Sequence, residues 1–332
     1  ANGELAEFPN ESPSAEAKKI ELALTQLVNE PEVSEWIKTE FPPREIHRRN
    51  TGYALDVFAE NPSQNTAKLL AGSEGTLALT TELTLQIDPL PPEFGLLVCG
   101  HFSSIHESMV ATRTAMKKEP FSCELMDKVI LDLTLKNKLQ AKNRFFVEGD
   151  PAAVLVVELR GETQEEVNEA AKALIHEWKE EKLGYACPLV AEEDASKVWD
   201  LRKAGLGLLS NIKGEAKPVA CIEDTAVTLD VLPDYIDEFE KMMERFGQQA
   251  VYYAHAGAGE LHLRPILNLK TQKGQKLFHE ISEETDSTYD AVMKLLQKGH
   301  NVREVALIAM FIGRTEGYLQ AESDMEEEIK DK

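Results

Sequence analysis

The first ninety residues show a helical pattern of apolar positions that changes to a strand-like pattern. Between residues 14 and 38, apolar side chains recur at helical spacing, and the pattern stops at the sequence FPPRE. A proline pair in this position is typical of the end of a helix. From Leu77 to Ile87 apolar and polar residues alternate, which predicts a strand with one face in a core. Two prolines follow Leu90, so we predict a first domain over 1–92.

The rest of the chain alternates short apolar runs with longer helical stretches. Three of the runs are GLLVCGHF, AVLVVEL and VACIEDTAV, and helical periodicity covers about 103–118, 163–182, 194–210 and 232–246. No dinucleotide-binding glycine fingerprint joins a strand to a helix. The pattern therefore predicts an α+β fold in which a mixed or antiparallel sheet is covered by helices on one side. We expect this second domain over 93–269, with helices and an acidic tail over 270–332.

Composition and charge exclude several functions. The 332 residues, 42% hydrophobic and 28% charged, carry a formal charge of -22 without a basic stripe, which argues against a nucleic-acid partner. The apolar runs are shorter than the ~20 residues of a membrane span. Four single cysteines without a C-x-x-C pair argue against a disulfide scaffold and favour a reducing compartment, most simply the cytoplasm.

A glycine bracket, GSEGT, runs from Gly72 to Thr76. It lacks the Lys-Ser/Thr of a phosphate-binding P-loop. A dinucleotide-binding turn would open a helix, whereas this bracket precedes a predicted strand. Two explanations remain. The bracket is a plain helix-to-strand turn, or it is a loop whose bare backbone N–H groups approach a ligand, with the hydroxyls of Ser73 and Thr76 as further partners.

The sequence AVYYAHAGAGELHLRPIL is typical of a β-hairpin around a glycine-rich turn. If Ala258 and Gly259 are the central turn residues, His255 lies directly across from His262. Opposed residues have Cβ atoms about 4.5–5.5 Å apart, so the two imidazoles could converge on a metal ion. A cross-strand histidine pair with only a structural role is the alternative.

Four motifs in this order, RRNTGYALD, GSEGT, PVACIEDTAV and HAGAGELHLRP, together resemble one family. They are similar to the FAD-linked oxidases of the vanillyl-alcohol oxidase class, in the branch of D-lactate, glycolate and D-2-hydroxyglutarate dehydrogenases. The resemblance covers about residues 1–284. It implies the second half of a PCMH-type FAD-binding domain followed by an FAD-linked oxidase C-terminal (cap) domain. The pyrophosphate-binding loop of the first half is not in this sequence, so we expect a fragment.

The resemblance also implies roles for individual residues. Those expected to line the flavin are Thr51, Gly52, Tyr53, Gly72, Ser73, Glu74, Gly75, Thr76, Glu223 and Asp224. Arg202, Lys217 and Arg264 are expected to bind substrate carboxylates, although each could also be an ordinary surface charge. His255 and His262 are expected to hold zinc or manganese beside the substrate hydroxyl, or to supply a catalytic base if no metal binds. The glutamate motif that completes this metal site in the family does not follow His262, which leaves the third ligand open.

We therefore predict an FAD-dependent oxidoreductase that acts on a D-2-hydroxy acid of the lactate, glycolate or 2-hydroxyglutarate type, by hydride transfer to the flavin. The first alternative is a non-catalytic substrate-binding fragment or subunit that cannot hold flavin by itself. The second is a metal hydrolase built on the histidine pair. The particular substrate, the electron acceptor and the oligomeric state stay open.

Overall fold

The computed structural model describes residues 5–8, 14–42, 44–46, 48–49, 52–297 and 307–308, with side chains as far as residue 285. The chain forms two compact units, and the boundary between them lies between Asp88 and Pro89. The four residues 45–48 group with the second unit. Each unit is described by itself.

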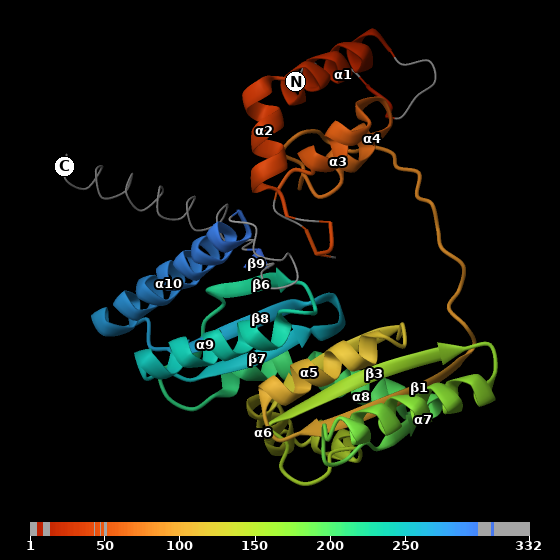
Figure 1. Cartoon of the computed structure of the whole chain (residues 1–332), viewed down its shortest axis with the longest axis vertical. Coiled ribbons are helices and arrows are strands. Elements are labelled where there is room, and N and C mark those ends of the chain that lie inside the picture. The colour runs from red at the N-terminus through yellow and green to blue at the C-terminus, as the bar shows by residue number, and fades with distance from the viewer. Residues whose placement is uncertain are drawn as a thin grey trace. The chain divides into compact units, whose positions relative to one another are not determined.

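The first unit is helical. Its helices are α1 (Ala15–Val28), α2 (Pro31–Glu40), α3 (Leu55–Glu60) and α4 (Pro62–Leu70) (Figure 1). The segment predicted as one helix over 14–38 is two helices, because Pro31 starts the second one at a position where its missing N–H costs nothing. A small core joins the helices through Val28, Ile37, Phe58 and Leu69.

The strand predicted from Leu77 to Ile87 is not formed. This segment has no strand assignment, and the side chains of Leu79 and Ile87 are 88% and 86% exposed. Alternation of apolar residues marks a potential buried face, but a strand also needs a neighbouring strand to accept and donate its backbone hydrogen bonds. None of the described residues supplies that neighbour.

The second unit is built on one antiparallel sheet, as predicted. Its strands are β1 (Phe94–Phe102), β2 (Ser122–Asp127), β3 (Ala153–Gly161), β4 (Leu189–Ala191), β5 (Lys217–Pro218), β6 (Ile222–Val227), β7 (Ala250–His255), β8 (Glu260–Leu267) and β9 (Leu307–Ile308). Their order is β4-β1-β3-β2-β7-β8-β6-β9, and β5 pairs with β8. Strands β2, β7, β8 and β6 are therefore neighbours, although they come from distant parts of the chain.

Helices cover both faces of this sheet, so the prediction of a single covered face is wrong. One face packs against α5 (Ile105–Met116), α7 (Gln164–Glu180), α9 (Leu232–Phe246) and the start of α10 (Gln272–Gln297), and the other against α6 (Lys128–Lys136) and α8 (Glu192–Leu208) (Figure 1). Strand β1 is buried at every position after its first. Such a strand has no solvent face, which is why its apolar run does not alternate.

Asp127 joins three of these elements at the end of β2. Its Oδ1 accepts a hydrogen bond from the N–H of Ile130 in the first turn of α6, and its Oδ2 accepts one from the N–H of Tyr252 in β7, both at 2.9 Å. Burial raises the pKa of Asp127 to about 7, although these two backbone donors oppose the rise. This buried carboxyl therefore fixes helix α6 and strand β7 against each other.

The four cysteines, Cys99, Cys123, Cys187 and Cys221, are free thiols. Burial raises the pKa of Cys187 to about 11 and that of Cys221 to about 12, so these thiols stay protonated at neutral pH. No helix in the described part of the chain is both long and apolar enough to cross a bilayer.

Asp127 leads to a prediction about stability. Its raised pKa means that the folded protein holds this proton more tightly than the unfolded chain does. Its contribution to stability is therefore fully present in acid and falls as the pH rises through about 7. Asp127→Asn cannot ionise, so the wild type should exceed the variant in free energy of unfolding by more at about pH 5 than at about pH 8. Urea unfolding at the two pH values measures this, and an equal difference at both would contradict it.

Candidate functional site

The glycine bracket follows α4 as an open loop. Gly72 and Gly75 have φ angles of 78° and 75°, and Glu74 has a φ of 52°, all in the left-handed region that favours glycine. A Cβ atom added at either glycine would meet nothing within 4 Å. The space beside the backbone at Gly72 and Gly75 is therefore open, which a loop that binds a ligand through its backbone requires.

The structure brings two of the sequence motifs together at this loop. The hydroxyl of Tyr53 hydrogen-bonds the hydroxyl of Thr76 over 2.7 Å, and the backbone N–H of Thr76 donates to the carbonyl of the buried Ser73. Gly52, with a φ of 109°, precedes the tyrosine. Thr51 lies outside the described residues, so its role stays a prediction.

The register of the β7–β8 hairpin differs from the predicted one by two residues. His255 lies opposite Glu260, and His262 lies opposite Tyr253. The cause is the turn, which is a short 3₁₀ helix, η3 (Ala256–Ala258), closed by Gly259 with a φ of 69°. Because side chains alternate with a period of two, the two histidines still share one face of the hairpin. They are diagonal neighbours, with ring centroids 5.3 Å apart.

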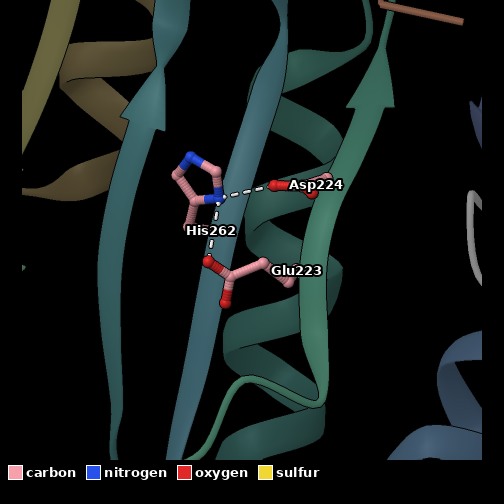
Figure 2. Close-up of side chains that lie close together, drawn as sticks. All are labelled: Glu223, Asp224 and His262. Atoms are coloured by element: carbon pink, nitrogen blue, oxygen red, sulfur yellow. Dashed lines mark ion pairs between the residues drawn. The ribbon is translucent and has the colours of Figure 1, made fainter. Parts of the chain in front are cut away.

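A bulge in β6 aims two adjacent carboxylates at His262. The pairing with β8 shifts between Ile222 and Thr225, and Asp224 between them has a φ of 61°. The extra residue lets Ile222 and Thr225 both enter the core, so Glu223 and Asp224 both face the other way. Asp224 Oδ1 lies 3.0 Å and Glu223 Oε1 lies 3.3 Å from Nδ1 of His262. Figure 2 shows both carboxylates turned toward this nitrogen.

These three side chains lie close enough together that they could hold a metal ion. One ligand atom from each of Glu223, Asp224 and His262 lies within 4.8 Å of the others. Ligands about 2.0–2.1 Å from a tetrahedral zinc ion lie about 3.3 Å from one another, which is close to the observed separations. The buried Nδ1 of His262 forms ion pairs with both carboxylates, 3.0 and 3.3 Å from their oxygens. The atoms therefore converge on a common point, as they would around an ion.

Glu223 is held in its charged form. Burial alone would raise its pKa, but His262 and Arg264 outweigh burial and hold the pKa of Glu223 below its ordinary value. Arg264 contributes through its Nη2, which donates to Glu223 Oε1. An ionised carboxylate that is anchored beside a histidine is ready to accept a cation.

Glu124 of β2 holds the other half of the site. His255 Nδ1 lies 3.0 and 3.1 Å from its two carboxylate oxygens, and Arg202 of α8 donates to the same carboxylate. Arg202 also stacks over the ring of Tyr253 at 4.3 Å. The predicted substrate-binding arginine thus already pairs with an internal carboxylate. Sequence reasoning missed Glu124, and its signal was a glutamate inside the otherwise apolar strand sequence CELM.

Lys217 makes different contacts from the two arginines. Its ammonium donates to the backbone carbonyls of Ser210 and Ile212, 3.1 and 2.5 Å away, at the end of the 3₁₀ helix η2 (Leu209–Asn211). Within the described residues, the Lys217 ammonium donates its hydrogen bonds to these carbonyls and does not donate to His255 or His262. Arg202 and Arg264, in contrast, both lie in contact with carboxylates beside the histidines.

We use the name hairpin cluster for Glu124, Arg202, Glu223, Asp224, His255, Glu260, His262 and Arg264. The cluster contains four carboxylates and two guanidinium groups. Arg48, whose guanidinium lies 3.0 Å from Glu260, raises the number of guanidinium groups to three, which is still fewer than the carboxylates. Arg202, Lys217 and Arg264 were expected to bind substrate carboxylates here. The structure shows a negative excess, which would repel a carboxylate substrate unless a cation is present.

The hairpin cluster also holds every buried side-chain nitrogen or oxygen that lacks a hydrogen-bond partner among the described residues. These atoms are Arg202 Nε, Glu223 Oε2, Glu260 Oε2, His262 Nδ1 and Arg264 Nε. Two of them still lie in ion pairs, Glu260 Oε2 with Arg48 Nε and His262 Nδ1 with the carboxylates of Glu223 and Asp224. Buried polar groups are almost always paired in native proteins, and exceptions point to a ligand, an ion or water. Their concentration in one place marks the hairpin cluster as the candidate active site.

The fold and site agree with a family assignment. Residues 91–298 match the model of the FAD linked oxidases, C-terminal domain, and the chain belongs to this family. The match covers the whole described sheet up to β8 together with helix α10.

Several relatives carry names from the same branch. D-2-hydroxyglutarate dehydrogenase of Pseudomonas putida is 30% identical over 75% of this chain, and its Haemophilus influenzae counterpart is 30% identical over 82%. These matches span only 25% and 27% of the relatives' own lengths. Glycolate oxidase subunit GlcD of Escherichia coli is 24% identical over 61% of this chain and 39% of that protein.

Among solved structures, alkyldihydroxyacetonephosphate synthase overlaps with 77% of this chain and 54% of that chain, at 13% identity and a TM-score of 0.41. An overlap of this size carries no argument about the fold.

The contacts of Arg202 predict a stability effect. Its side chain is 10% exposed and pairs with Glu124, so Arg202→Ala should leave a buried carboxylate without its partner and lower the free energy of unfolding by about 3 kcal/mol. Lys203, the next residue along α8, is exposed and points about 100° away around the helix. Lys203→Ala should change stability by less than about 0.5 kcal/mol. Denaturant unfolding compares them, and equal losses would contradict the pairing.

Proposed function

We propose that the chain is the substrate-binding part of an FAD-dependent oxidoreductase that oxidises a D-2-hydroxy acid beside a divalent cation. The observation that carries the proposal is the set of buried polar atoms in the hairpin cluster that make no hydrogen bond with the described residues. The family supports the flavin, and the relatives' names, D-2-hydroxyglutarate dehydrogenase and D-lactate dehydrogenase, support the substrate class. Four free cysteines suit a reducing compartment, and on that ground we place the protein in the cytoplasm.

Glu223, Asp224 and His262 are proposed to hold the cation, with zinc or manganese as candidates. This ligand set differs from the histidine pair expected from the sequence, because the ligand atoms of His255 are not among the group that converges. The cation would offset the negative excess of the cluster. It would also bind the hydroxyl and carboxylate oxygens of a 2-hydroxy acid together, and lower the pKa of that hydroxyl.

The remaining donors suit carboxylates and a flavin. Arg202 and Arg264 each keep a buried Nε–H without a partner, which can donate to a substrate carboxylate. Residues Gly52, Tyr53 and Gly72 to Thr76 are proposed to hold FAD, together with Thr51, since the bare backbone at Gly72 and Gly75 leaves room for a close approach. When bound, FAD supplies the hydride acceptor.

Metal binding tests the proposed cation site. Zinc or manganese titrated into the chain by calorimetry should occupy one strong site. His262→Ala and Asp224→Asn should each weaken that site by on the order of 100-fold, because each removes one donor from a small set. His176→Ala provides the matched control, since His176 is exposed on α7. Absence of strong binding in the wild type, or equal weakening by the control variant, would refute the site.

Ligand binding tests the substrate class. With metal present, D-2-hydroxyglutarate should bind more tightly than D-lactate by roughly tenfold to hundredfold, the value of one further charge-assisted hydrogen bond. Glutarate, which lacks the hydroxyl, should bind weakly and without a metal requirement. If glutarate and D-2-hydroxyglutarate bind alike, the cation does not recognise the hydroxyl and the proposed function fails.

A further inference from the structure

A single carboxylate, that of Glu124, contacts two residues of the proposed active site. It accepts a hydrogen bond from Arg202 and lies 3.0 and 3.1 Å from Nδ1 of His255. The side chain of Glu124 is 15% exposed, whereas that of His255 is 34% exposed. His255 therefore has one edge fixed against Glu124 and another edge open to a ligand.

Several interactions fix the position of the Arg202 side chain beside the Glu124 carboxylate. Its Nη2 donates to Glu124 and also to the carbonyl of Ala254, 3.2 Å away, next to His255 in β7. Its guanidinium covers the ring of Tyr253, and the Tyr253 hydroxyl donates to the backbone carbonyl of Arg202. Movement of Glu124 would therefore disturb both the arginine and the histidine.

We propose that Glu124 is a positioning residue that fixes the tautomer of His255 while it orients Arg202. This inference rests on the proposed function and deepens it. An ionised carboxylate only accepts hydrogen bonds, so the neutral imidazole beside it must carry its hydrogen on Nδ1. Nε2 then keeps its lone pair on the open edge of the ring.

The fixed tautomer divides the work between the two histidines. His262 lies with the carboxylates proposed to bind the cation, and His255 lies outside that group. A hydrogen held on Nδ1 leaves the Nε2 lone pair of His255 free to accept a hydrogen bond from a ligand.

The substitution Glu124→Gln separates this role from simple packing. A glutamine side chain has the same shape, but it offers one acceptor oxygen and an NH₂ donor. Only its oxygen can accept, and the permanently protonated Arg202, which has no acceptor of its own, competes for that oxygen. We expect its oxygen to stay with Arg202 and its NH₂ to face His255, whose Nδ1 must then become the acceptor.

The experiment reads the tautomers directly in the chain labelled with ¹⁵N-histidine, without flavin or metal. Long-range ¹H–¹⁵N correlation spectra are recorded at a pH where imidazoles are neutral, and His255→Gln assigns the signal. In the wild type we expect His255 to be mainly the Nδ1–H tautomer, and in Glu124→Gln mainly the Nε2–H tautomer. His101 is the internal reference, since its Nδ1 lies 2.8 Å from the Cys99 carbonyl and its Nε2 accepts the Glu148 N–H.

Glu158→Gln is the matched control. Glu158 is a strand carboxylate of low exposure that pairs with Arg160, so the same substitution removes a similar ion pair without a histidine. We expect no change in the His255 tautomer there. An Nε2–H tautomer in the wild type would overturn the proposal without any variant, which covers the case in which Glu124→Gln does not fold. An unchanged tautomer in a folded Glu124→Gln would overturn it too. Neither result depends on whether the chain binds a hydroxy acid.

Discussion

The candidate site depends on the tight turn at Gly259. This residue has a φ of 69°, and a Cβ atom built on it would lie 2.0 Å from the carbonyl oxygen of Val227 in β6. The N–H of Val227 donates to the Gly259 carbonyl at 3.0 Å, so β6 closes against the hairpin at this point. The turn sets the β7–β8 register, and the contact brings the β6 bulge beside His262. Only a residue without a side chain allows both.

The charge balance of the site follows from that geometry. The bulge turns Glu223 and Asp224 toward His262, and Arg264 pairs with only Glu223 of these two carboxylates. Arg202 in turn is paired with Glu124. In a chain with a net charge of -22, an anionic substrate gains little from the general electrostatic field. On the proposed function, recognition would come from local donors and from the proposed cation, since guanidinium groups already paired with carboxylates have few free hydrogens.

The two arginines have structural roles in addition to the binding roles proposed for them. Arg202 stabilises its own surroundings through Glu124, the Ala254 carbonyl and the Tyr253 ring, yet its Nε stays unpartnered. A side chain locked in this way loses little conformational freedom when it binds a ligand. The negative excess is therefore compatible with the proposed site, because the internal carboxylates orient the groups proposed to bind the substrate.

The sequence by itself determined the α+β class, the antiparallel sheet, the family and the shared face of His255 and His262, because each depends on local periodicity or on motifs read along the chain. Tertiary structure decided the rest. The contact between Glu124 and His255 joins residues 131 positions apart, and it exists because β2 pairs with β7 in the sheet order. The bulge that turns Asp224 toward His262, the two-residue change of register and the helices on both sheet faces have the same origin. Alternation along a strand shows which side chains share a face, but the neighbouring strand and the close approach at Gly259 decide which of them meet.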